Sequence, residues 1–278
     1  MKNTVLITGA SSGIGKAAAK FFVGQGWNVI ATMRTPDAES ELVHMSDMLV
    51  TRLDVQDRDS IDQAIKAGIA RFGKIDALIN NAGFSLFGVF EAISPEKIQQ
   101  QFDVNVFGVM NVTRTILPHF RANKGGLIVN ISSRAGIVTL PMNSLYCATK
   151  FALEGFSEAL AYELASQNIG VKIVEPGGGA SGTNFGQRMS KEYAQDASLT
   201  DYGAFITRMN AIYTGMRGSG HITTADDIAR AIYDAAADGT DQLRYAVGND
   251  TPPFIKARRE MSDQDYVDFM RSHFLPKS

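Results

Sequence analysis

Cysteine is almost absent from this sequence, because Cys147 stands alone among 278 residues. A single thiol excludes a disulfide within the chain and is typical of a protein kept in a reducing compartment. Long apolar runs are absent too, since no stretch reaches the length of about 18 residues that a membrane-spanning helix needs. The first apolar stretch, Val5–Ile7, stops at Thr8-Gly9 and is too short for the hydrophobic part of a signal peptide. We therefore expect a cytoplasmic protein without a membrane anchor.

The sequence also lacks an excess of charge of one sign. It has 27 Lys and Arg against 29 Asp and Glu, a net charge of −2, and no long basic run. We therefore expect neither a nucleic acid nor an anionic membrane surface as a partner. The 4 histidines stand far apart, with no zinc-ligand spacing to one another or to the cysteine: His44, His119, His221 and His273. The sequence predicts no metal site.

Short apolar runs alternate with stretches of helical periodicity over residues 1–175. The runs read as buried strands: Thr4–Thr8, Asn28–Met33, Leu49–Asp54, Ala77–Asn80, Leu127–Ser132 and Val171–Glu175. Between them, helical faces are predicted within Ile14–Phe22 and Ile61–Ile69, and longer helices over Ile98–Phe120 and Leu145–Leu164. Such alternation predicts an α/β fold: one doubly wound Rossmann-type parallel sheet with helices on both faces.

The periodicity breaks after Glu175. Residues 176–222 are rich in Gly, Ser and Met, show no clean period, and are interpreted as a lid-like, substrate-binding insert. Thr224 is a predicted N-cap for a helix over Ala225–Ala237, which Gly239 ends. A last strand is predicted at Arg244–Val247, and one helix in the tail, residues 251–278. With no repeat or linker, residues 1–278 are interpreted as one domain whose residues 1–175 bind the cofactor and carry out catalysis.

A glycine-rich turn joins the first strand to the first helix: Thr8-Gly9-Ala10-Ser11-Ser12-Gly13-Ile14-Gly15. Such a turn presents backbone N–H groups and a helix N-terminus to a diphosphate, although a tight turn without a ligand has the same composition. A P-loop is excluded, because Ala10 and Ala17 stand where it needs Gly and Ser or Thr. The common G-x-G-x-x-G spacing is excluded as well, since Gly9, Gly13 and Gly15 give G-x-x-x-G-x-G.

That spacing resembles the cofactor turn of the short-chain dehydrogenase/reductase family. Further family-like motifs follow in the family's order over roughly residues 1–250. They are Asn80-Asn81-Ala82-Gly83, Asn105, Ser132-Ser133, Tyr146-Cys147-Ala148-Thr149-Lys150 and Pro176-Gly177. The resemblance implies hydride transfer between a nicotinamide cofactor and a carbonyl or secondary alcohol. It also implies a homodimer or homotetramer packed through the two long helices.

Tyr146 and Lys150 are four residues apart and therefore share a helix face. A nearby ammonium favours the phenolate, so we expect a lowered pKa for Tyr146, which would exchange a proton with the substrate oxygen. An ordinary helix with a packed Tyr and an exposed Lys is the alternative. The resemblance adds Ser133, which holds the substrate oxygen, and Asn105, which holds a water that links Lys150 to solvent.

Two neighbouring side chains, Ser132 and Cys147, are alternative candidates for a catalytic role. Strand alternation points Ser132 to the opposite face from Ser133, so we prefer Ser133. Cys147 is tempting as a nucleophile, but adjacent helix residues point about 100° apart, and no His is near it in the sequence. We interpret Cys147 as a packing residue.

The predicted cofactor-binding residues come from the family-like motifs: Gly9, Ser11, Ser12, Gly13, Ile14, Gly15, Arg34, Asp54, Val55, Asn81, Ala82, Gly83, Tyr146, Lys150, Pro176, Gly177, Gly179 and Thr183. The preferred cofactor is NADPH, with NADH as the alternative. Thr32 is taken to stand where NAD-dependent relatives have Asp, and Arg34 could hold a 2′-phosphate. Ser12 stands where many NADPH enzymes have a basic residue, which weakens this preference. The run Gly178–Thr183 departs from the family pattern and leaves open whether Ser181 or Thr183 meets the cofactor.

The expected substrate is a bulky, apolar, uncharged ketone. Its predicted contacts are apolar residues after the cofactor turns and in the insert: Phe84, Leu86, Leu140, Met142, Phe185 and Met189. Packing of these side chains within the domain is the alternative, and Arg188, Lys191, Arg208 and Arg217 keep a charged substrate open. The sequence thus predicts an NADPH-dependent carbonyl reductase. The alternatives are an NAD-dependent secondary alcohol dehydrogenase, a sugar epimerase and a non-catalytic dinucleotide sensor, which typically lacks the Tyr or the Lys.

Overall fold

The computed structural model describes residues 2–177, 192–194, 196–217, 223–248 and 252–275. In these residues a 7-stranded parallel sheet has the order β3-β2-β1-β4-β5-β6-β7. The strands are β1 (Thr4–Ile7), β2 (Asn28–Met33), β3 (Met48–Arg52), β4 (Ala77–Asn80), β5 (Gly126–Ile131), β6 (Ile169–Pro176) and β7 (Arg244–Val247). The predicted doubly wound α/β fold is confirmed, and the strand order reverses between β1 and β4. Ligands of such sheets bind outside the carboxyl ends of the strands at this reversal.

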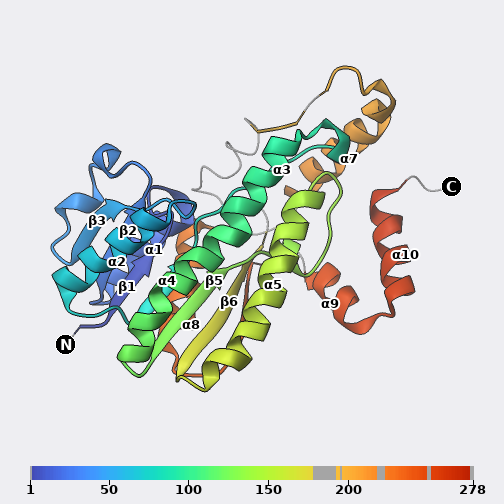
Figure 1. Cartoon of the computed structure of the whole chain (residues 1–278). Helices are drawn as coiled ribbons and strands as arrows, with labels where there is room; N and C mark the ends of the chain where they lie inside the picture. Colours follow the sequence, from blue (N-terminus) through green and yellow to red (C-terminus); the bar gives the residue numbers. More distant parts are fainter. Residues whose placement is uncertain (1, 178–191, 195, 218–222, 249–251, 276–278) are drawn as a thin grey trace.

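Helices cover both faces of the sheet (Figure 1). On one face, α1 (Gly13–Gly24) packs on β1 and β2, and α8 (Ala225–Ala237) packs beside α1 on β5, β6 and β7, through apolar residues such as Phe22 and Ile232. On the other face, the helices α2 (Arg58–Phe72), α4 (Gly108–Ala122) and α5 (Ser144–Ala165) bury residues such as Ile61, Ile116 and Leu160. Because both faces are covered, the strands are almost continuously apolar. Among the described residues, no helix is long and apolar enough to span a membrane.

The predicted helix over residues 98–120 is present but starts earlier and changes its winding. It consists of α3 (Pro95–Phe102), a π-helical segment (Asp103–Phe107) and α4. Ser94 begins it as an N-cap that accepts a hydrogen bond from the Lys97 N–H at 3.4 Å. π-Helical turns inside helices often mark functional sites, and this one contains Asn105.

The carboxyl-terminal part contains two helices that the sequence analysis missed. Residues 203–217 of the predicted irregular insert form α7 (Gly203–Arg217). The tail forms two helices, α9 (Pro252–Glu260) and α10 (Asp263–Phe274), so the prediction of one helix there was wrong. The Ser262 side chain caps α10 by accepting from the Asp265 N–H, which restarts the helix after α9 ends. These three helices pack with residues 137–142 in an apolar cluster around Met209, Phe254 and Met270.

Short 3-10 segments complete the described chain and lie in the loops: Pro36–Ala38, Leu42–His44, Phe90–Ala92, Arg134–Gly136 and Thr200–Tyr202. The loop that follows β4 lies near residues 192–194. The Ala194 N–H donates to the Phe87 carbonyl at 2.9 Å, and Phe87 forms a parallel bridge with Tyr193. Part of the insert is thereby fixed over the loop that follows the predicted cofactor turn.

Candidate active site

The glycine turn after β1 and the Asn-Asn-Ala-Gly turn after β4 form one hydrogen-bonded unit. The Thr8 hydroxyl accepts hydrogen bonds from the N–H groups of Asn81 (3.0 Å) and Ala82 (3.1 Å). In return, the Asn81 side-chain amide donates to the carbonyl oxygens of Thr8 (2.9 Å) and Gly9 (3.2 Å). Thr8 was not among the predicted site residues, although it opens the quoted motif. Its role is to lock the two turns together at the strand reversal.

Close backbone packing explains the glycines of the turn. Gly9 and Gly13 have positive φ values of 70° and 56°, which side-chain-bearing residues rarely adopt. A Cβ atom at Gly15 would lie 2.4 Å from the Gly9 carbonyl oxygen and 2.5 Å from the Asn81 side-chain nitrogen. The N-terminus of α1 is capped by no side chain, and Ser11 and Ser12 are exposed. This glycine-lined cradle at a free helix N-terminus fits the diphosphate of a dinucleotide.

Tyr146, Ser133 and Lys150 come together at the start of α5. Tyr146 lies on the first turn of this helix, and its hydroxyl hydrogen-bonds with the Ser133 side chain from the end of β5. Ser133 also accepts from the Ala135 N–H at 3.1 Å, which fixes its side chain. Ser132 instead lies beside Glu154, on the other side of the strand end. The structure thus places Ser133, rather than Ser132, next to Tyr146.

The charge states of Tyr146 and Lys150 are dominated by burial. Desolvation raises the pKa of Tyr146 to about 12, although its hydrogen bond with Ser133 acts in the opposite direction. Burial also lowers the pKa of Lys150 to about 8, because its ammonium lies in an apolar environment. The Lys150 Nζ atom donates to the Ile131 carbonyl at 2.7 Å and lies 5.6 Å from the Tyr146 ring centroid. The expected net lowering of the Tyr146 pKa was therefore wrong for this structure, because desolvation outweighs the interactions that favour the phenolate.

Asn105 positions the chain that follows the Asn-Asn-Ala-Gly turn. Its side-chain oxygen accepts from the Phe84 N–H (3.0 Å), and its amide nitrogen donates to the Phe84 carbonyl (2.8 Å) and to the Thr149 hydroxyl (3.1 Å). A Cβ atom at Gly83 would lie 3.2 Å from the same oxygen. Asn105 therefore links the turn after β4 to α5. Its predicted water-holding role stays a prediction.

The ends of β2 and β3 carry the residues predicted to face the adenosine. Arg34 follows β2, is exposed, and forms no hydrogen bond or ion pair within the described part of the chain. Asp54 accepts from the Gln56 N–H at 3.0 Å, and Val55 is buried against α4 near Gly108. The free guanidinium and the Asp54-Val55 turn lie beyond the carboxyl ends of neighbouring strands, since β2 pairs with β3.

Two side chains near Arg34 in the sequence already have partners within the protein. Thr32 is fully buried, and its hydroxyl donates to the Ile7 carbonyl at 2.9 Å, so it does not face a ribose. The prediction that Thr32 takes the place of an acidic ribose ligand was wrong, because this position packs against β1. The Glu39 carboxylate lies nearby in the sequence, but Lys16 and the N–H groups of Glu41 and Leu42 already bind it.

Several predicted residues lie outside the described part of the chain: Gly179, Ser181, Thr183, Phe185, Arg188, Met189 and Lys191. Pro176 ends β6, and the Gly177 N–H donates to the Val247 carbonyl at 2.6 Å. Pro176 and Gly177 therefore lie at the carboxyl edge of the sheet, beside the other motifs.

The predicted substrate residues divide into two groups. Phe84 and Leu86 are buried and pack with Ile93 and Leu145, so they belong to the core, as the packing alternative proposed. Met142 and Leu140 belong to a second apolar cluster over the start of α5, together with Phe87, Tyr193, Met209 and Tyr213. The Tyr213 hydroxyl donates to the Pro141 carbonyl at 2.8 Å, which ties α7 to this loop.

An apolar cavity of about 610 Å³ opens between the same loop, α5 and α10. Its walls include Leu140, Cys147, Phe151, Tyr266, Met270 and Phe274. The Cys147 thiol lies 4.0 Å from the Val138 carbonyl oxygen, and burial raises its pKa. A buried, protonated thiol is a poor nucleophile, which supports the packing interpretation.

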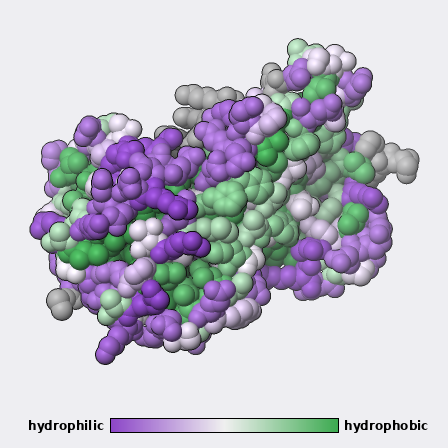
Figure 2. Space-filling view, in the orientation of Figure 1, coloured by the Kyte–Doolittle hydropathy of each residue, from purple (hydrophilic) through white to green (hydrophobic). Residues whose placement is uncertain are grey.

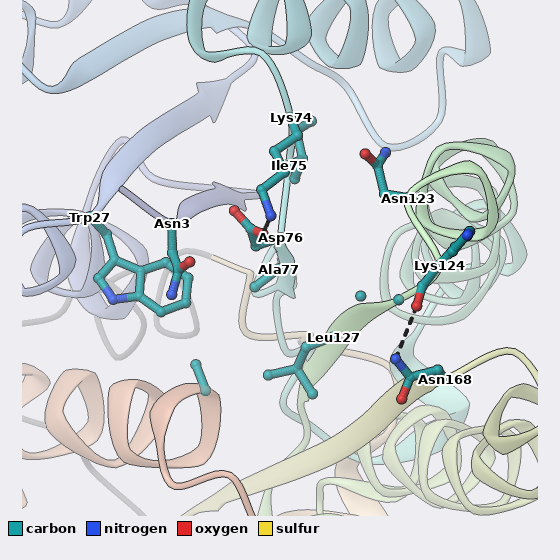
Figure 3. Close-up of a pocket in the computed structure, with 13 residues that line it drawn as sticks. Asn3, Trp27, Lys74, Ile75, Asp76, Ala77, Asn123, Lys124, Leu127 and Asn168 are labelled. Carbon is teal, nitrogen blue, oxygen red and sulfur yellow. Dashed lines mark hydrogen bonds and ion pairs between the residues drawn. The ribbon is translucent and has the colours of Figure 1, made fainter. Parts of the chain in front are cut away.

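A second cavity, of about 450 Å³, lies at the opposite, amino-terminal edge of the sheet (Figure 3). Several of its polar groups already have partners. Asp76 accepts from the Thr4 N–H at 2.8 Å, and the Asn168 amide donates to the Lys124 carbonyl at 2.9 Å. We therefore assign no reaction to it. Within the described residues, no group of three or more His, Cys, Asp or Glu side chains is arranged to hold a metal ion.

A family model described as short chain dehydrogenase matches residues 3–194. The chain belongs to this family. An uncharacterized oxidoreductase of Schizosaccharomyces pombe is 35% identical over 237 residues, covering 84% of this chain and 96% of the relative. A 3-ketodihydrosphingosine reductase of Bacteroides thetaiotaomicron is 38% identical over 217 residues, covering 78% of each protein.

Solved structures agree with this assignment. A short-chain dehydrogenase from Streptomyces avermitilis superposes with a TM-score of 0.79 at 32% identity, covering 98% of this chain and 95% of the other. ElxO with NADP bound has a TM-score of 0.71 at 27% identity, covering 88% and 98%. A 3-ketoacyl-(acyl-carrier-protein) reductase from Brucella melitensis complexed with NADH has a TM-score of 0.72 at 27% identity, covering 88% and 96%.

This short-chain dehydrogenase is an NAD(P)-dependent oxidoreductase. The cofactor and the protein side chains have different roles in such an enzyme. The nicotinamide cofactor, when bound, supplies or accepts the hydride. The glycine cradle would hold its diphosphate. Burial raises the pKa of the Tyr146 phenol and keeps it protonated, and its hydroxyl is hydrogen-bonded to the Ser133 side chain.

Proposed function

We propose that this short-chain dehydrogenase uses NADPH to reduce a bulky, uncharged ketone or aldehyde to an alcohol, with Tyr146 as the proton donor. The observation that carries the cofactor preference is the exposed guanidinium of Arg34, which is unpaired within the described residues. A guanidinium can bind a 2′-phosphate through two hydrogen bonds. The Glu39 carboxylate, already held by Lys16 and two N–H groups, does not compete for it.

The substrate preference is supported by the apolar surroundings of α5. Met142, in the loop that leads into α5, clusters with Phe87, Tyr193 and Tyr213, and the ring centroids of Phe87 and Tyr213 are 5.5 Å apart. Apolar pockets with few polar groups select bulky apolar ligands. The reductase of Bacteroides thetaiotaomicron named above acts, by its name, on a 3-ketodihydrosphingosine, a ketone with a long apolar chain.

The test is a panel of ketones assayed by nicotinamide absorbance at 340 nm with NADPH and with NADH. Long-chain, aromatic and steroid-like ketones should be reduced with higher kcat/KM than 2-oxo acids of similar size. A clear preference for carboxylates would contradict the substrate class. Equal efficiency with NADH would favour the second candidate, an NAD-dependent secondary alcohol dehydrogenase, which the uncharged Ser12 in the glycine turn supports.

We also propose that the chain forms a homodimer or homotetramer through α4 and α5. Apolar side chains gather on this face, over the two helices (Figure 2). The exposed large side chains of these elements include Phe107, which directly precedes α4, and Tyr162 on α5. An exposed apolar patch of this kind is typical of an interface between subunits. The single cysteine supports a reducing compartment, and we propose the cytoplasm.

A further inference from the structure

Two buried carboxyl groups lie close to each other on α5 and β6. Glu154 is on α5, one helical turn after Lys150, and Glu175 is on β6. Both converge on one nitrogen of Arg244 on β7, with the Nε atom 3.1 Å from Glu154 Oε2 and 3.4 Å from Glu175 Oε1. Glu154 is 6% exposed and Glu175 2% exposed. Two acids are therefore held close together out of water by a shared guanidinium.

Arg244 does not fully compensate this charge. Its Nη2 atom is also bound to Glu158, at 2.5 Å, so one cation serves three carboxylates. Glu154 Oε1 and both Glu175 oxygens receive no hydrogen bond from the described residues. Burial raises the pKa of both acids, and the charge of Glu154 further raises that of Glu175, to about 7. Close, buried carboxyl groups share a proton near neutral pH and titrate as a pair.

The pair is coupled to the proposed proton donor along one helix face. Tyr146, Lys150 and Glu154 follow one another at intervals of four residues on α5. Gly136 leaves room for this arrangement, since a Cβ atom there would lie 2.8 Å from Glu154 Cγ and 3.1 Å from the Lys150 carbonyl oxygen. The negative charge of Glu154 raises the pKa of Lys150 against the effect of burial. Whether Glu154 is ionised therefore influences how firmly Lys150 holds its proton.

Groups on three other elements, and Glu158 on α5 itself, complete the surroundings. The Ser132 hydroxyl at the end of β5 lies beside Glu154, and Arg244 of β7 faces both acids. Arg259 of α9 acts on Glu175 from a greater distance. Glu158 and Arg244 have side chains 42% and 31% exposed, so the cluster reaches solvent at these two residues.

We propose that Glu154 is a positioning residue that keeps Lys150 protonated, and that Glu175 and Arg244 decide at which pH Glu154 carries its charge. The kinetic consequence rests on the proposed ketone reductase function. In that reaction the nicotinamide gives a hydride to the carbonyl carbon, and the Tyr146 O–H bond breaks as the alcohol O–H bond forms. The phenolate left on Tyr146 is stabilised by the Lys150 ammonium, and a solvent proton restores the phenol. Loss of the Lys150 proton therefore sets the pH above which kcat/KM for ketone reduction falls.

The kinetic experiment compares Glu154→Gln with two matched variants over pH 6–10. In Glu154→Gln the basic limb of kcat/KM should move to lower pH by about one unit, an approximately tenfold loss at pH 8.5 relative to pH 6.5. Glu175→Gln also removes one carboxylate from the pair, but Glu175 lies on β6 and not one helical turn from Lys150. It should therefore move the basic limb by less than half the shift of Glu154→Gln. Glu163→Gln, an exposed acid on the same helix, should not move it. Equal shifts in the two buried variants would overturn the proposal.

A second readout needs no activity. Lys150 has a lowered pKa in the folded state, so the free energy of unfolding should rise with pH between the folded and unfolded values, about 8 and 10.5. In Glu154→Gln this rise should begin at lower pH, measured by urea denaturation. The difference should vanish in a Lys150→Met background, and its persistence there would overturn the proposal. A stability difference without reduction of any ketone would instead reject the proposed function and leave the Glu154–Lys150 coupling supported.

Discussion

The Lys150 Nζ atom donates a hydrogen bond of 2.7 Å to the main-chain carbonyl oxygen of Ile131. Ile131 is the last residue of β5, so this bond fixes the first turns of α5 against the strand end that carries Ser133. It also turns the ammonium toward the strand, while the Tyr146 hydroxyl meets Ser133. Lys150 thus orients the helix that presents Tyr146, in addition to supplying charge.

The first prediction concerns the proton donor. Tyr146→Phe should lower kcat for ketone reduction by about 10²–10⁴-fold, because the ring remains and only the transferable proton is lost. NADPH binding, measured by the change in its fluorescence, should stay within about twofold of wild type. Tyr162→Phe is the matched control, since this tyrosine is exposed on the same helix. Near-native turnover of Tyr146→Phe would contradict its assignment.

The second prediction concerns cofactor choice. Arg34→Ala should reduce kcat/KM for NADPH by about 10–150-fold, because one charged hydrogen-bonded contact of about 1.5–3 kcal/mol is lost, and should leave NADH unchanged. Arg52→Ala is the control, since Arg52 ends the neighbouring strand but its guanidinium is bound to Asp57 at 2.9 Å. If Arg34→Ala weakens both cofactors alike, the phosphate contact is refuted. The buried Thr32 makes Thr32→Asp unsuitable for this test, because it would bury a carboxylate.

The third prediction concerns the glycine cradle. Gly15→Ala places a Cβ atom 2.4 Å from the Gly9 carbonyl oxygen, so the turn must open and NADPH affinity should fall more than tenfold. Gly24→Ala, in the same helix, meets no atom within 4 Å and should change affinity less than twofold. Calorimetric titration with NADPH measures both. Equal affinities for the two variants would show that the close approach is not needed.

The fourth prediction concerns the pH dependence of stability. The pKa of Glu175 is raised from 4.5 to about 7 in the folded protein, so the folded state binds its proton more tightly than the unfolded state. This contribution is fully present below pH 4.5 and is lost as the pH rises through 7, a change of about 2–3 kcal/mol. Glu175→Gln should therefore lose less stability than wild type between pH 5 and pH 8. Urea denaturation at both values measures this, and parallel losses in the two proteins would count against a buried, protonated Glu175.

The fifth prediction concerns assembly. Replacement of Phe107 and Tyr162 by Glu places charges on the apolar face of α4 and α5 and should convert the proposed oligomer to a monomer. Light scattering coupled to size exclusion measures the mass. Phe90→Glu is the control, because Phe90 is also exposed but lies in the loop after β4. A monomeric wild-type protein would refute the oligomer.

Local patterns predicted much of this molecule. The strands β1 to β6 stand out because apolar runs buried on both faces have no polar alternation. The glycine spacing predicted the turn, since Gly9 and Gly13 need positive φ values and Gly15 a close backbone approach. Alternation along β5 correctly separated Ser132 from Ser133. Each of these inferences depends on residues that are neighbours in the sequence.

Other features depended on partners far away in the sequence. Hydrophobicity could not distinguish Phe84 and Leu86, which pack in the core, from Met142, which lies in the cluster over α5. A single spacing of four residues predicted a lowered Tyr146 pKa, but burial by the whole fold decided the opposite direction.

The Glu154–Glu175–Arg244 cluster was invisible in the sequence for the same reason. Arg244 meets Glu175 only because β7 pairs with β6, and Glu154 reaches both only because α5 packs on that strand. Sequence determined which segments become strands, helices and phosphate-binding turns, because those depend on short-range geometry. Tertiary structure decided which side chains are buried and which charges meet, because desolvation and Coulomb energies depend on the atoms that surround a group, wherever they lie in the chain.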